Sequence, residues 1–503
     1  MTSLNRRLFD SQKFRAEAAT PSPKPPVGIL QIGDGNFLRA FADWMIDVTN
    51  GQGLFNGRVT IAQPLDRGLA DKLRAQDGLY TVLLRGLQGG KVVESRRIVS
   101  CVDDALNPYA DWAAMLAKAA DPATRFVISN TTEAGIAYVE EALDEARCPQ
   151  GFPAKVAALL LHRFKTLGGS AATGLVFLPC ELIEANGSNL RQIVLKHAQD
   201  WKLPTEFVAW VQEHNHFCNT LVDRIVPGFP AGEADAQFAE QGYDDPLMVA
   251  AEPFHLWVIE GPSALAEEFP LHKAGLDVIW TDDLQPYRTR KVRVLNGAHT
   301  ASALAAYLAS LDTVLEMTSD AEVSAYLQKL MFDEIVPCLD LPDAERMGYA
   351  RTIMERFANP HIRHELISIS LNSVSKWQVR VLPTVKDHVR EHGQAPAALA
   401  FSLAALLAFY RGRFDERGDY VGARGDKSYV IRDNPDVLGV WAEAWRSWEQ
   451  DQDTAALVGR VLGDVRLWGE DLKAVPGLAD KVAQPLETIL REGMRPALRA
   501  LLA

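Results

Sequence analysis

Three polar side chains lie close together in one short apolar segment of the chain: Lys291, Asn296 and His299. An ammonium group can transfer a proton, an amide can donate a hydrogen bond to a developing alkoxide, and an imidazole can orient a hydroxylated ligand. On an α-helix of about 100° per residue these side chains point near about 0°, 140° and 80°, which is one arc of less than half the helix. The spacing therefore favours a shared site for one small molecule. The alternative is structural: a lysine that reaches solvent, an asparagine that caps a turn and a histidine satisfied in the core.

The residues between these three predict that the segment is buried. They are mostly apolar: Val292, Val294, Leu295 and Ala298. Burial beside other donors lowers the pKa of an ammonium group toward neutral pH, which suits a general acid. The N-terminal half of the chain carries a second pattern that bears on function.

A strand, a glycine turn and a helix are predicted in succession near the N-terminus. Residues 27–32 form a short apolar run, Gly33 and Gly35 follow it, and a helical pattern begins directly afterwards. Glycines let the backbone approach a pyrophosphate, and the helix N-terminus offers N–H donors, so this is the opening of a dinucleotide-binding unit. Leu38 stands where the third glycine of G-x-G-x-x-G would be, which leaves the motif incomplete. The candidate cofactor-binding residues here are Ile32, Gly33, Asp34, Gly35, Asn36, Phe37, Leu38 and Arg39.

An acidic residue past the second predicted strand indicates which cofactor is bound. Residues 58–62 form that strand, and Asp66 follows it. A carboxylate there would bond the adenosine ribose hydroxyls and favour NAD over NADP. Gln63 lies closer to the strand end and Arg67 could favour a phosphate, so both cofactors stay open on spacing alone.

Two later strands each run into a polar cluster. Residues 125–129 lead to Asn130, Thr132 and Glu133, and residues 174–178 lead to Glu181 and Asn186. Ligands of open α/β sheets bind beyond the carboxyl ends of the strands, so we expect cofactor and substrate contacts here. The alternative is that these are turn and helix-cap residues.

Length and patterning predict two domains. The first, residues 1–285, is a Rossmann-type dinucleotide-binding domain with an extended sheet, and the second, residues 286–503, is mostly α-helical and carries the substrate and catalytic residues. The fold class is therefore α/β followed by a helical domain. Residues 395–409 predict a buried helix, and residues 411–427 a surface excursion.

The composition excludes several classes of protein. A net charge of -13 argues against nucleic acid or an anionic membrane as partner, and five scattered cysteines without a C-x-x-C pair favour a cytoplasmic protein with free thiols. We expect a monomer or small homo-oligomer. A zinc site at His214, His216 and Cys218 is the metal-dependent alternative, and a nucleotide sensor without chemistry is the alternative outside enzymology.

Taken together, these motifs resemble the polyol-specific long-chain dehydrogenase/reductase family, which includes mannitol dehydrogenases and hexuronate reductases. The family pattern of Lys, Asn and His is met by Lys291, Asn296 and His299, and its glycine turn is met without a third glycine. Further matches follow the same order along the chain: residues 222–225, 252–254, 257–259, 356–360 and 375–376.

The resemblance is greatest to the hexuronate-reducing branch of that family, and it implies a reaction. NADH would reduce the C2 ketone of D-tagaturonate reversibly to D-altronate without a metal, so the partner is a small hexuronate or aldonate. Fructuronate reduction and mannitol oxidation are the alternatives within the family. Leu182 and Ser368 stand where mannitol dehydrogenases carry an asparagine and an arginine, which weakens the mannitol reading.

The resemblance also assigns roles. Lys291 would be the general acid, Asn296 would bond the developing alkoxide and His299 would orient the substrate. Asp223 would bind a substrate hydroxyl or fix His299. For the substrate carboxylate, Lys376 is the first candidate, followed by Arg380 and His364.

Overall fold

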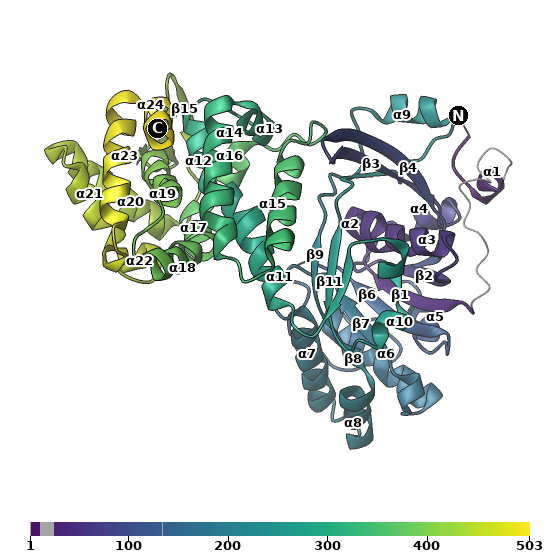
Figure 1. Ribbon diagram of the computed structural model, residues 1–503. Coiled ribbons are helices and arrows are strands. Elements are labelled where there is room, and N and C mark those ends of the chain that lie inside the picture. Colours follow the sequence, from purple (N-terminus) through teal and green to yellow (C-terminus); the bar gives the residue numbers. More distant parts are fainter. Residues whose placement is uncertain (1, 11–24, 133) are drawn as a thin grey trace. The chain divides into compact units, whose positions relative to one another are not determined.

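The computed structural model describes residues 2–10, 25–132 and 134–503, and these form two compact units. The first unit consists of Met1–Gly86 and Lys91–Leu284, and the second of Leu87–Gly90 and Gln285–Ala503. In Figure 1 the chain runs from purple to teal through the first and from green to yellow through the second. The division thus follows Leu284, and four residues at the tip of a hairpin, 87–90, group with the second unit, which the sequence did not indicate.

A parallel sheet of six strands forms the centre of the first unit. Its strand order is β5-β2-β1-β6-β7-β8. The strands are β1 (Val27–Ile32), β2 (Gly57–Ala62), β5 (Val102–Leu106), β6 (Thr124–Ser129), β7 (Val176–Pro179) and β8 (His216–Phe217). The order reverses direction between β1 and β6, which is the switch point where ligands of doubly wound sheets bind. The predicted Rossmann-type fold is confirmed.

Side-chain alternation along these strands builds a core on each face of the sheet. In β1, Ile29 packs into one hydrophobic cluster, while Leu30 and Ile32 pack into the other. In β6, Phe126 and Ile128 join the first cluster and Val127 the second. Because both faces are buried, the strands are apolar throughout, as residues 27–32 and 125–129 already indicated.

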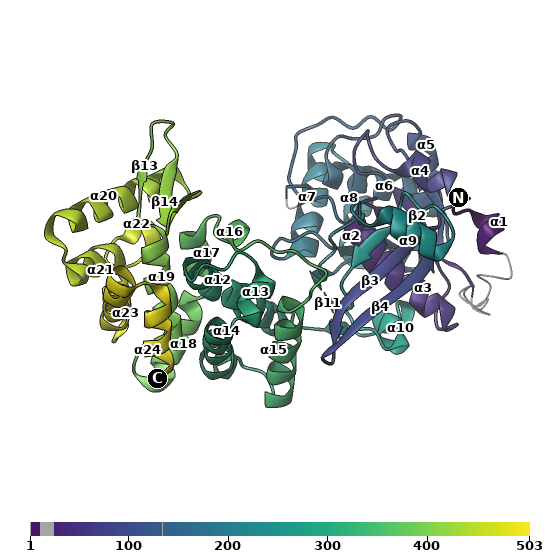
Figure 2. The ribbon, with the colours of Figure 1, turned by 90° about the horizontal axis from the view of Figure 1, so that it is seen from above.

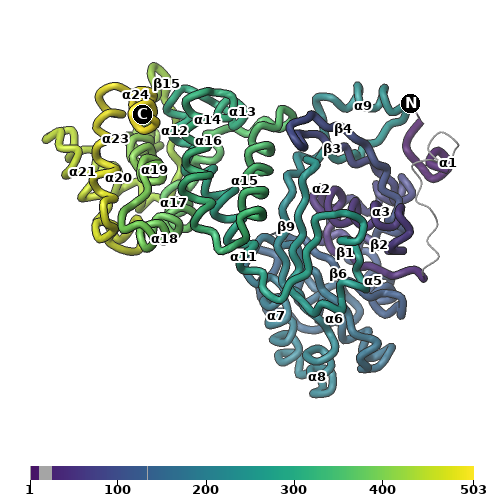
Figure 3. The backbone as a smooth tube through the Cα atoms, viewed as in Figure 1, coloured from purple at the N-terminus to yellow at the C-terminus, as the bar shows by residue number. Residues whose placement is uncertain are grey.

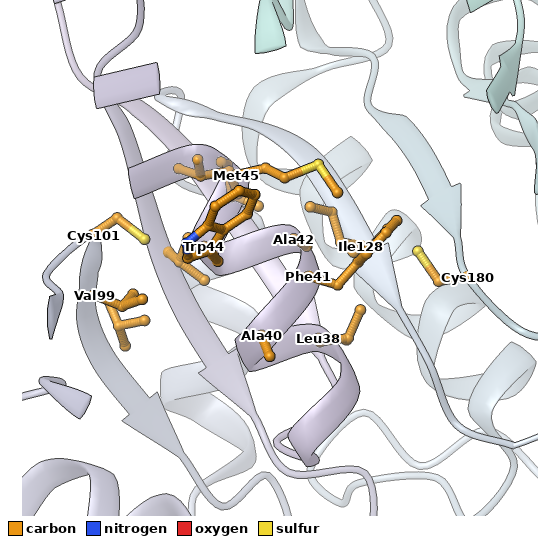
Figure 4. Packing of buried hydrophobic residues seen from close by; sticks show 14 of the residues in the cluster. Leu38, Ala40, Phe41, Ala42, Trp44, Met45, Val99, Cys101, Ile128 and Cys180 are labelled. Atoms are coloured by element: carbon orange, nitrogen blue, oxygen red, sulfur yellow. The ribbon is translucent and has the colours of Figure 1, made fainter. Parts of the chain in front are cut away.

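One helical segment covers the first face. It runs without a break through α2 (Asn36–Leu38), the π-helix η1 (Arg39–Asp43) and α3 (Trp44–Gly51). Figure 4 shows its apolar side chains between Val99 and Cys101 on one side and Ile128 and Cys180 on the other. This packing fixes the start of the helix directly after β1.

The opposite face is covered by helices whose side chains build the second cluster. They are α5 (Trp112–Ala119), α6 (Phe152–Leu167), α7 (Asn186–Asp200) and α8 (Thr205–His214). The remaining short helices of this unit are α1 (Arg6–Phe9), α4 (Ala70–Ala75), η2 (Ala171–Thr173), α9 (Ala234–Gln241), α10 (Leu265–Glu268) and η3 (Leu271–Ala274).

Two further sheets extend the first unit. One has the order β10-β3-β4 and the other β12-β11-β9. Their strands are β3 (Tyr80–Gln88), β4 (Lys91–Val99), β9 (Asn219–Asp223), β10 (Val249–Ala251), β11 (Leu256–Glu260) and β12 (Val278–Thr281). Gly89 and Gly90 form the turn between β3 and β4 with φ of 59° and 73°, values that glycine adopts without strain.

The second unit is mainly helical, as predicted. Its helices are α11 (Gln285–Arg290), η4 (Lys291–Gly297), α12 (Ala298–Leu308), α13 (Val314–Ser319), α14 (Ala321–Gln328), η5 (Lys329–Ile335), η6 (Val336–Cys338), α15 (Asp343–Phe357), α16 (Leu366–Ile369), α17 (Ser373–Arg380), α18 (Leu382–His392), α19 (Ala397–Phe409), α20 (Pro435–Asp451), α21 (Thr454–Leu462), α22 (Val465–Trp468), η7 (Leu472–Ala474), α23 (Leu478–Glu492) and α24 (Met494–Leu502). Helix α19 is buried along almost its whole length and packs against α12 and α23 (Figure 3). In the described part of the chain, no helix is long and apolar enough to cross a membrane.

A small antiparallel sheet interrupts these helices. Strands β13 (Gly412–Phe414), β14 (Tyr420–Arg424) and β15 (Lys427–Val430) form it where the sequence indicated only a surface excursion (Figure 2). Tyr420 and Tyr429 are buried beneath it and donate to the carbonyls of Tyr410 and Phe409.

Candidate active site

The glycine turn after β1 leaves room for a ligand. Gly33 has φ of 139°, and a Cβ there would lie 3.0 Å from both the Asn130 carbonyl oxygen and Leu38 Cδ1, so this position requires glycine. A Cβ on Gly35 would meet no described atom within 4 Å. Gly35 is followed directly by the first turn of the helix, whose N–H groups suit a pyrophosphate.

The polar side chains of this turn mainly bond to the protein itself. Asp34 accepts a hydrogen bond from the Leu69 N–H at 2.5 Å. Arg39 is 2% exposed and donates to the carbonyls of Asp34 and Leu247 and to Asn36 Oδ1. The sequence placed Arg39 among the cofactor-binding residues; the structure shows its guanidinium bracing the turn. Ile32 and Leu38 are buried, and Phe37 stacks on Phe41 with ring centroids 4.8 Å apart.

A buried hydrogen-bond network supports the same turn, and sequence reasoning missed it. Gln31 Nε2 donates to the Gly33 carbonyl at 3.1 Å and to Asp43 Oδ2 at 3.2 Å, and the Tyr80 hydroxyl donates to Asp43 Oδ2 at 2.7 Å. Burial raises the pKa of Asp43 to about 7, against the opposing effects of Tyr80, Gln31 and Arg39. The sequence feature that could have indicated this network was Gln31, a glutamine inside an otherwise apolar strand.

Asp66 lies past the carboxyl end of β2 and is exposed, as are Leu65 and Arg67. Gln63 is buried, and its Nε2 donates to the carbonyls of Leu65 and Asp66 at 3.0 and 2.8 Å. Gln63 therefore shapes this loop through its backbone, while the Asp66 carboxylate faces outward.

The clusters after β6 and β7 are braced by Glu181. This residue is 2% exposed and accepts hydrogen bonds from Ser129 Oγ and from the Thr131 N–H and Oγ1 at 2.9 to 3.0 Å. Burial raises its pKa. Thr132 has φ of 95°, a strained value for a threonine, and Glu133 lies outside the described residues.

Asn130 is half-buried, and its Nδ2 donates to the Cys180 carbonyl at 3.4 Å. Asn186 is 1% exposed: its Nδ2 donates to the carbonyls of Pro179, Glu181 and Thr220, and its Oδ1 accepts from the N–H groups of Gly187 and Thr220. The structure thus uses Glu181 and Asn186, both expected to bind substrate, to hold the strand ends together. Asp223 is the last residue of β9, opposite Leu256 of β11, and is buried.

In the second unit, Lys291 and Asn296 lie on one π-helix, η4. The sequence predicted a helix here, and its geometry differs from the expected α form. A helix with bonds from residue i to i+5 turns less per residue than an α-helix, which brings Asn296 closer to the face of Lys291 than an α-helix would. Both side chains are half-buried. Short π segments of this kind occur frequently at functional sites.

His299 is the second residue of the next helix, α12, and contacts two rings. It stacks on Phe357 with centroids 3.9 Å apart and an interplanar angle of 10°, and His364 meets it edge-on at 5.2 Å. Burial lowers the pKa of His299 well below its usual value, and His364, Arg356 and Arg380 lower it further. The imidazole is therefore neutral at pH 7. Its Nε2 is buried and has no hydrogen-bond partner among the described residues.

Lys376 and Arg380 lie one turn apart on α17. Lys376 Nζ donates to the Ile369 carbonyl at 3.0 Å, and Arg380 Nη1 donates to Thr300 Oγ1 at 3.4 Å. Burial lowers the pKa of both groups; Arg380 lowers that of Lys376 further, and Asp433 opposes this. Ser368 is exposed.

The residues of the zinc alternative lie on different elements. His214 ends α8, His216 begins β8, and Cys218 follows β8 with its thiol pKa raised by burial to about 12. Across residues 2–10, 25–132 and 134–503, no group of three His, Cys, Asp or Glu side chains is arranged to hold a metal ion.

Comparison with known proteins finds matches along almost the whole chain. Residues 27–273 match a family profile described as the mannitol dehydrogenase Rossmann domain, and residues 283–490 match the mannitol dehydrogenase C-terminal domain. An altronate oxidoreductase of Halalkalibacterium halodurans is 44% identical over 483 residues, covering 96% of this chain and 94% of the relative. Another from Yersinia enterocolitica is 43% identical over 502 residues, covering 99% of this chain and 100% of the relative.

Two solved structures share the fold. A D-sorbitol dehydrogenase in substrate-free form aligns with a TM-score of 0.76 and 24% identity over 99% of this chain and 100% of its own. The ternary complex of Pseudomonas fluorescens mannitol 2-dehydrogenase with NAD and D-mannitol aligns with a TM-score of 0.66 and 25% identity, over 100% of this chain and 99% of its own.

Proposed function

This chain belongs to the mannitol dehydrogenase family, and from that membership we propose that it interconverts D-tagaturonate and D-altronate with NADH and NAD as the redox pair. One observation carries the proposal: relatives that are 43 to 44% identical across almost the full chain are altronate oxidoreductases. The enzyme is accordingly an NAD-dependent oxidoreductase that acts on a CH–OH group.

The first unit fits the cofactor. NADH supplies the hydride that reduces the ketone. The turn at Gly33 and Gly35 admits a pyrophosphate, since a Cβ at Gly35 would meet no described atom within 4 Å. The exposed Asp66 carboxylate past β2 fits the ribose hydroxyls and disfavours an additional phosphate. The buried Gln31 bond to the Gly33 carbonyl holds the turn in this shape.

The second unit supplies the proton. In the proposed reduction Lys291 donates a proton to the substrate oxygen, and the Asn296 amide donates a hydrogen bond to the alkoxide as it develops. His299 is neutral, and its unpartnered Nε2 is a suitable contact for a substrate hydroxyl. In the reverse direction Lys291 accepts the proton from the C2 hydroxyl of altronate.

The test of the function is NADH oxidation by the purified protein with D-tagaturonate, D-fructuronate and D-fructose compared side by side. We expect turnover with D-tagaturonate and little with the other two, and a preference for NADH over NADPH. Preference for D-fructuronate or D-fructose would contradict the assigned substrate. NADH binding without turnover of any of them would contradict enzymatic activity altogether.

The test of the proton donor is Lys291→Met. We expect kcat for D-tagaturonate to fall about 10²- to 10⁴-fold, the usual contribution of a general acid, with little change in the dissociation constant of NADH. Lys329→Met on η5 is the matched control, because its ammonium pairs with the exposed Asp333 at 3.8 Å. A Lys291→Met enzyme with near wild-type kcat would exclude the assigned role.

A further inference from the structure

Several positively charged or basic side chains in the second unit surround His299. Arg356, His364 and Arg380 each lower the pKa of the His299 imidazole, and Arg380 also lowers that of Lys376. Arg380 and Lys376 carry like charges that repel each other, and a bound anion would relieve this repulsion. A group of basic side chains is unusual in this protein, because the chain as a whole has a net charge of -13.

Among the described residues Arg380 has no carboxylate partner, in contrast to its neighbouring arginines. Arg290 and Arg293, on either side of Lys291, form ion pairs with Glu345 at 2.6 Å and Asp387 at 2.5 Å. No ion pair of Arg380 occurs in the described part of the chain. Its one hydrogen bond there, to Thr300 Oγ1, is 3.4 Å long, although a guanidinium carries five N–H donors.

Packing of the backbone places Arg380 next to the segment that bears Lys291, Asn296 and His299. Helix α17, which ends at Arg380, packs against η4 and α12, and Figure 2 shows α17 beside α12. The contact is close: a Cβ on Gly297 would lie 3.0 Å from the Arg380 carbonyl oxygen. Thr300, which Arg380 contacts, directly follows His299.

We propose that Arg380 binds the carboxylate of the substrate, with Lys376 as a second cation beside it, and thereby selects sugar acids over neutral polyols. This inference rests on the proposed function and names the residue that sets its substrate class. A guanidinium presents two parallel N–H donors that match a carboxylate, whereas an ammonium acts as a point charge. Lys376, the first candidate from the sequence, already donates to the Ile369 carbonyl and is attracted by Asp433.

The experiment compares inhibition of D-tagaturonate reduction by D-altronate with inhibition by D-altritol, the neutral polyol that has a hydroxymethyl group in place of the carboxylate. In Arg380→Gln, we expect the inhibition constant of D-altronate to rise about 10- to 100-fold, as for loss of a charge-assisted hydrogen bond. The constant for D-altritol and the KM for NADH should stay within about 3-fold of wild type by the same reasoning.

Two further variants make the result decisive. Arg363→Gln removes one positive charge from an exposed side chain of the same unit, and it should leave both inhibition constants unchanged. Arg380→Lys keeps the charge without the fork and should show a smaller loss for D-altronate alone; it also serves if Arg380→Gln does not fold.

The outcomes separate the two proposals. An equal loss for D-altronate and D-altritol, or no loss for D-altronate, would overturn the role of Arg380. A raised KM for NADH alone would show that Arg380 serves the cofactor phosphates and would equally overturn it. Absence of wild-type turnover with D-tagaturonate would instead refute the proposed function.

Discussion

Replacing Asp43 by asparagine should remove a pH-dependent loss of stability from the first unit. The Asp43 carboxyl is fully buried, and burial raises its pKa from 3.8 in the unfolded chain to about 7 in the fold. Between those two values the unfolded chain has released the proton while the folded protein retains it. The contribution of the Asp43 carboxyl to the free energy of unfolding is therefore fully present below pH 3.8. It falls as pH rises toward 7 and is lost above pH 7.

The size of the effect follows from the shift. Each pH unit well inside this window costs about 1.4 kcal/mol, so the full shift corresponds to about 4 kcal/mol. The part between pH 5 and pH 7 corresponds to about 2 kcal/mol, because half of the folded molecules still hold the proton at a pH equal to the folded pKa. Asparagine has nearly the same shape and cannot ionise, and its Oδ1 can still accept from the Tyr80 hydroxyl. Relative to wild type, Asp43→Asn should thus become more stable by about 2 kcal/mol as pH rises from 5 to 7.

The assay is urea unfolding of both proteins at several pH values from 5 to 8, with the difference in free energy of unfolding plotted against pH. Asp71→Asn, an exposed carboxylate of α4, is the control and should give a flat difference. A flat difference for Asp43→Asn, or one of opposite sign, would show that the buried carboxyl is ionised throughout and would refute the reasoning.

Two further predictions concern the glycine turn after β1 and the start of α19 in the second unit. Gly33→Ala should lower the melting temperature and weaken NADH binding, because φ is 139° and the new Cβ would lie 3.0 Å from a backbone oxygen. Gly35→Ala should lower NADH affinity at an unchanged melting temperature, because its Cβ would meet no described atom within 4 Å. Equal melting temperatures for the two variants would contradict the first claim. Glu334→Ala should destabilise the protein by about 2 to 3 kcal/mol with kcat unchanged, since its carboxylate accepts the N–H groups of Ala398 and Leu399 at the start of α19. Unaltered urea unfolding would show that this cap contributes nothing.

Much of the fold was predictable because its signals are local. A buried parallel strand is a short apolar run, and such runs at residues 27–32 and 125–129 became β1 and β6. Gly33 stood out because a tight turn before a helix needs a residue without a side chain. The spacing of Lys291, Asn296 and His299 led to the proposed chemistry, since the three lie within nine residues of one another.

The functions of the surrounding polar residues were not predictable in this way. Glu181 and Asn186 occupy positions where a ligand contact was expected, yet their oxygens and amide are bonded to strand ends. Arg39 braces the turn through a carbonyl more than two hundred positions away, at Leu247. Which polar groups are satisfied internally depends on partners that only the folded chain brings near.

The sequence by itself therefore determined the two-part organisation and the glycine turn after the first strand, and it supplied the residues proposed to carry the chemistry, because periodicity and short motifs act over a few neighbouring positions. Only the tertiary structure decided the π geometry of η4, the buried Gln31 and Asp43 network and the position of Arg380 beside Thr300. Hydrogen bonding and desolvation at those places depend on side chains from distant segments, and the pKa of a buried group is set by all of them together.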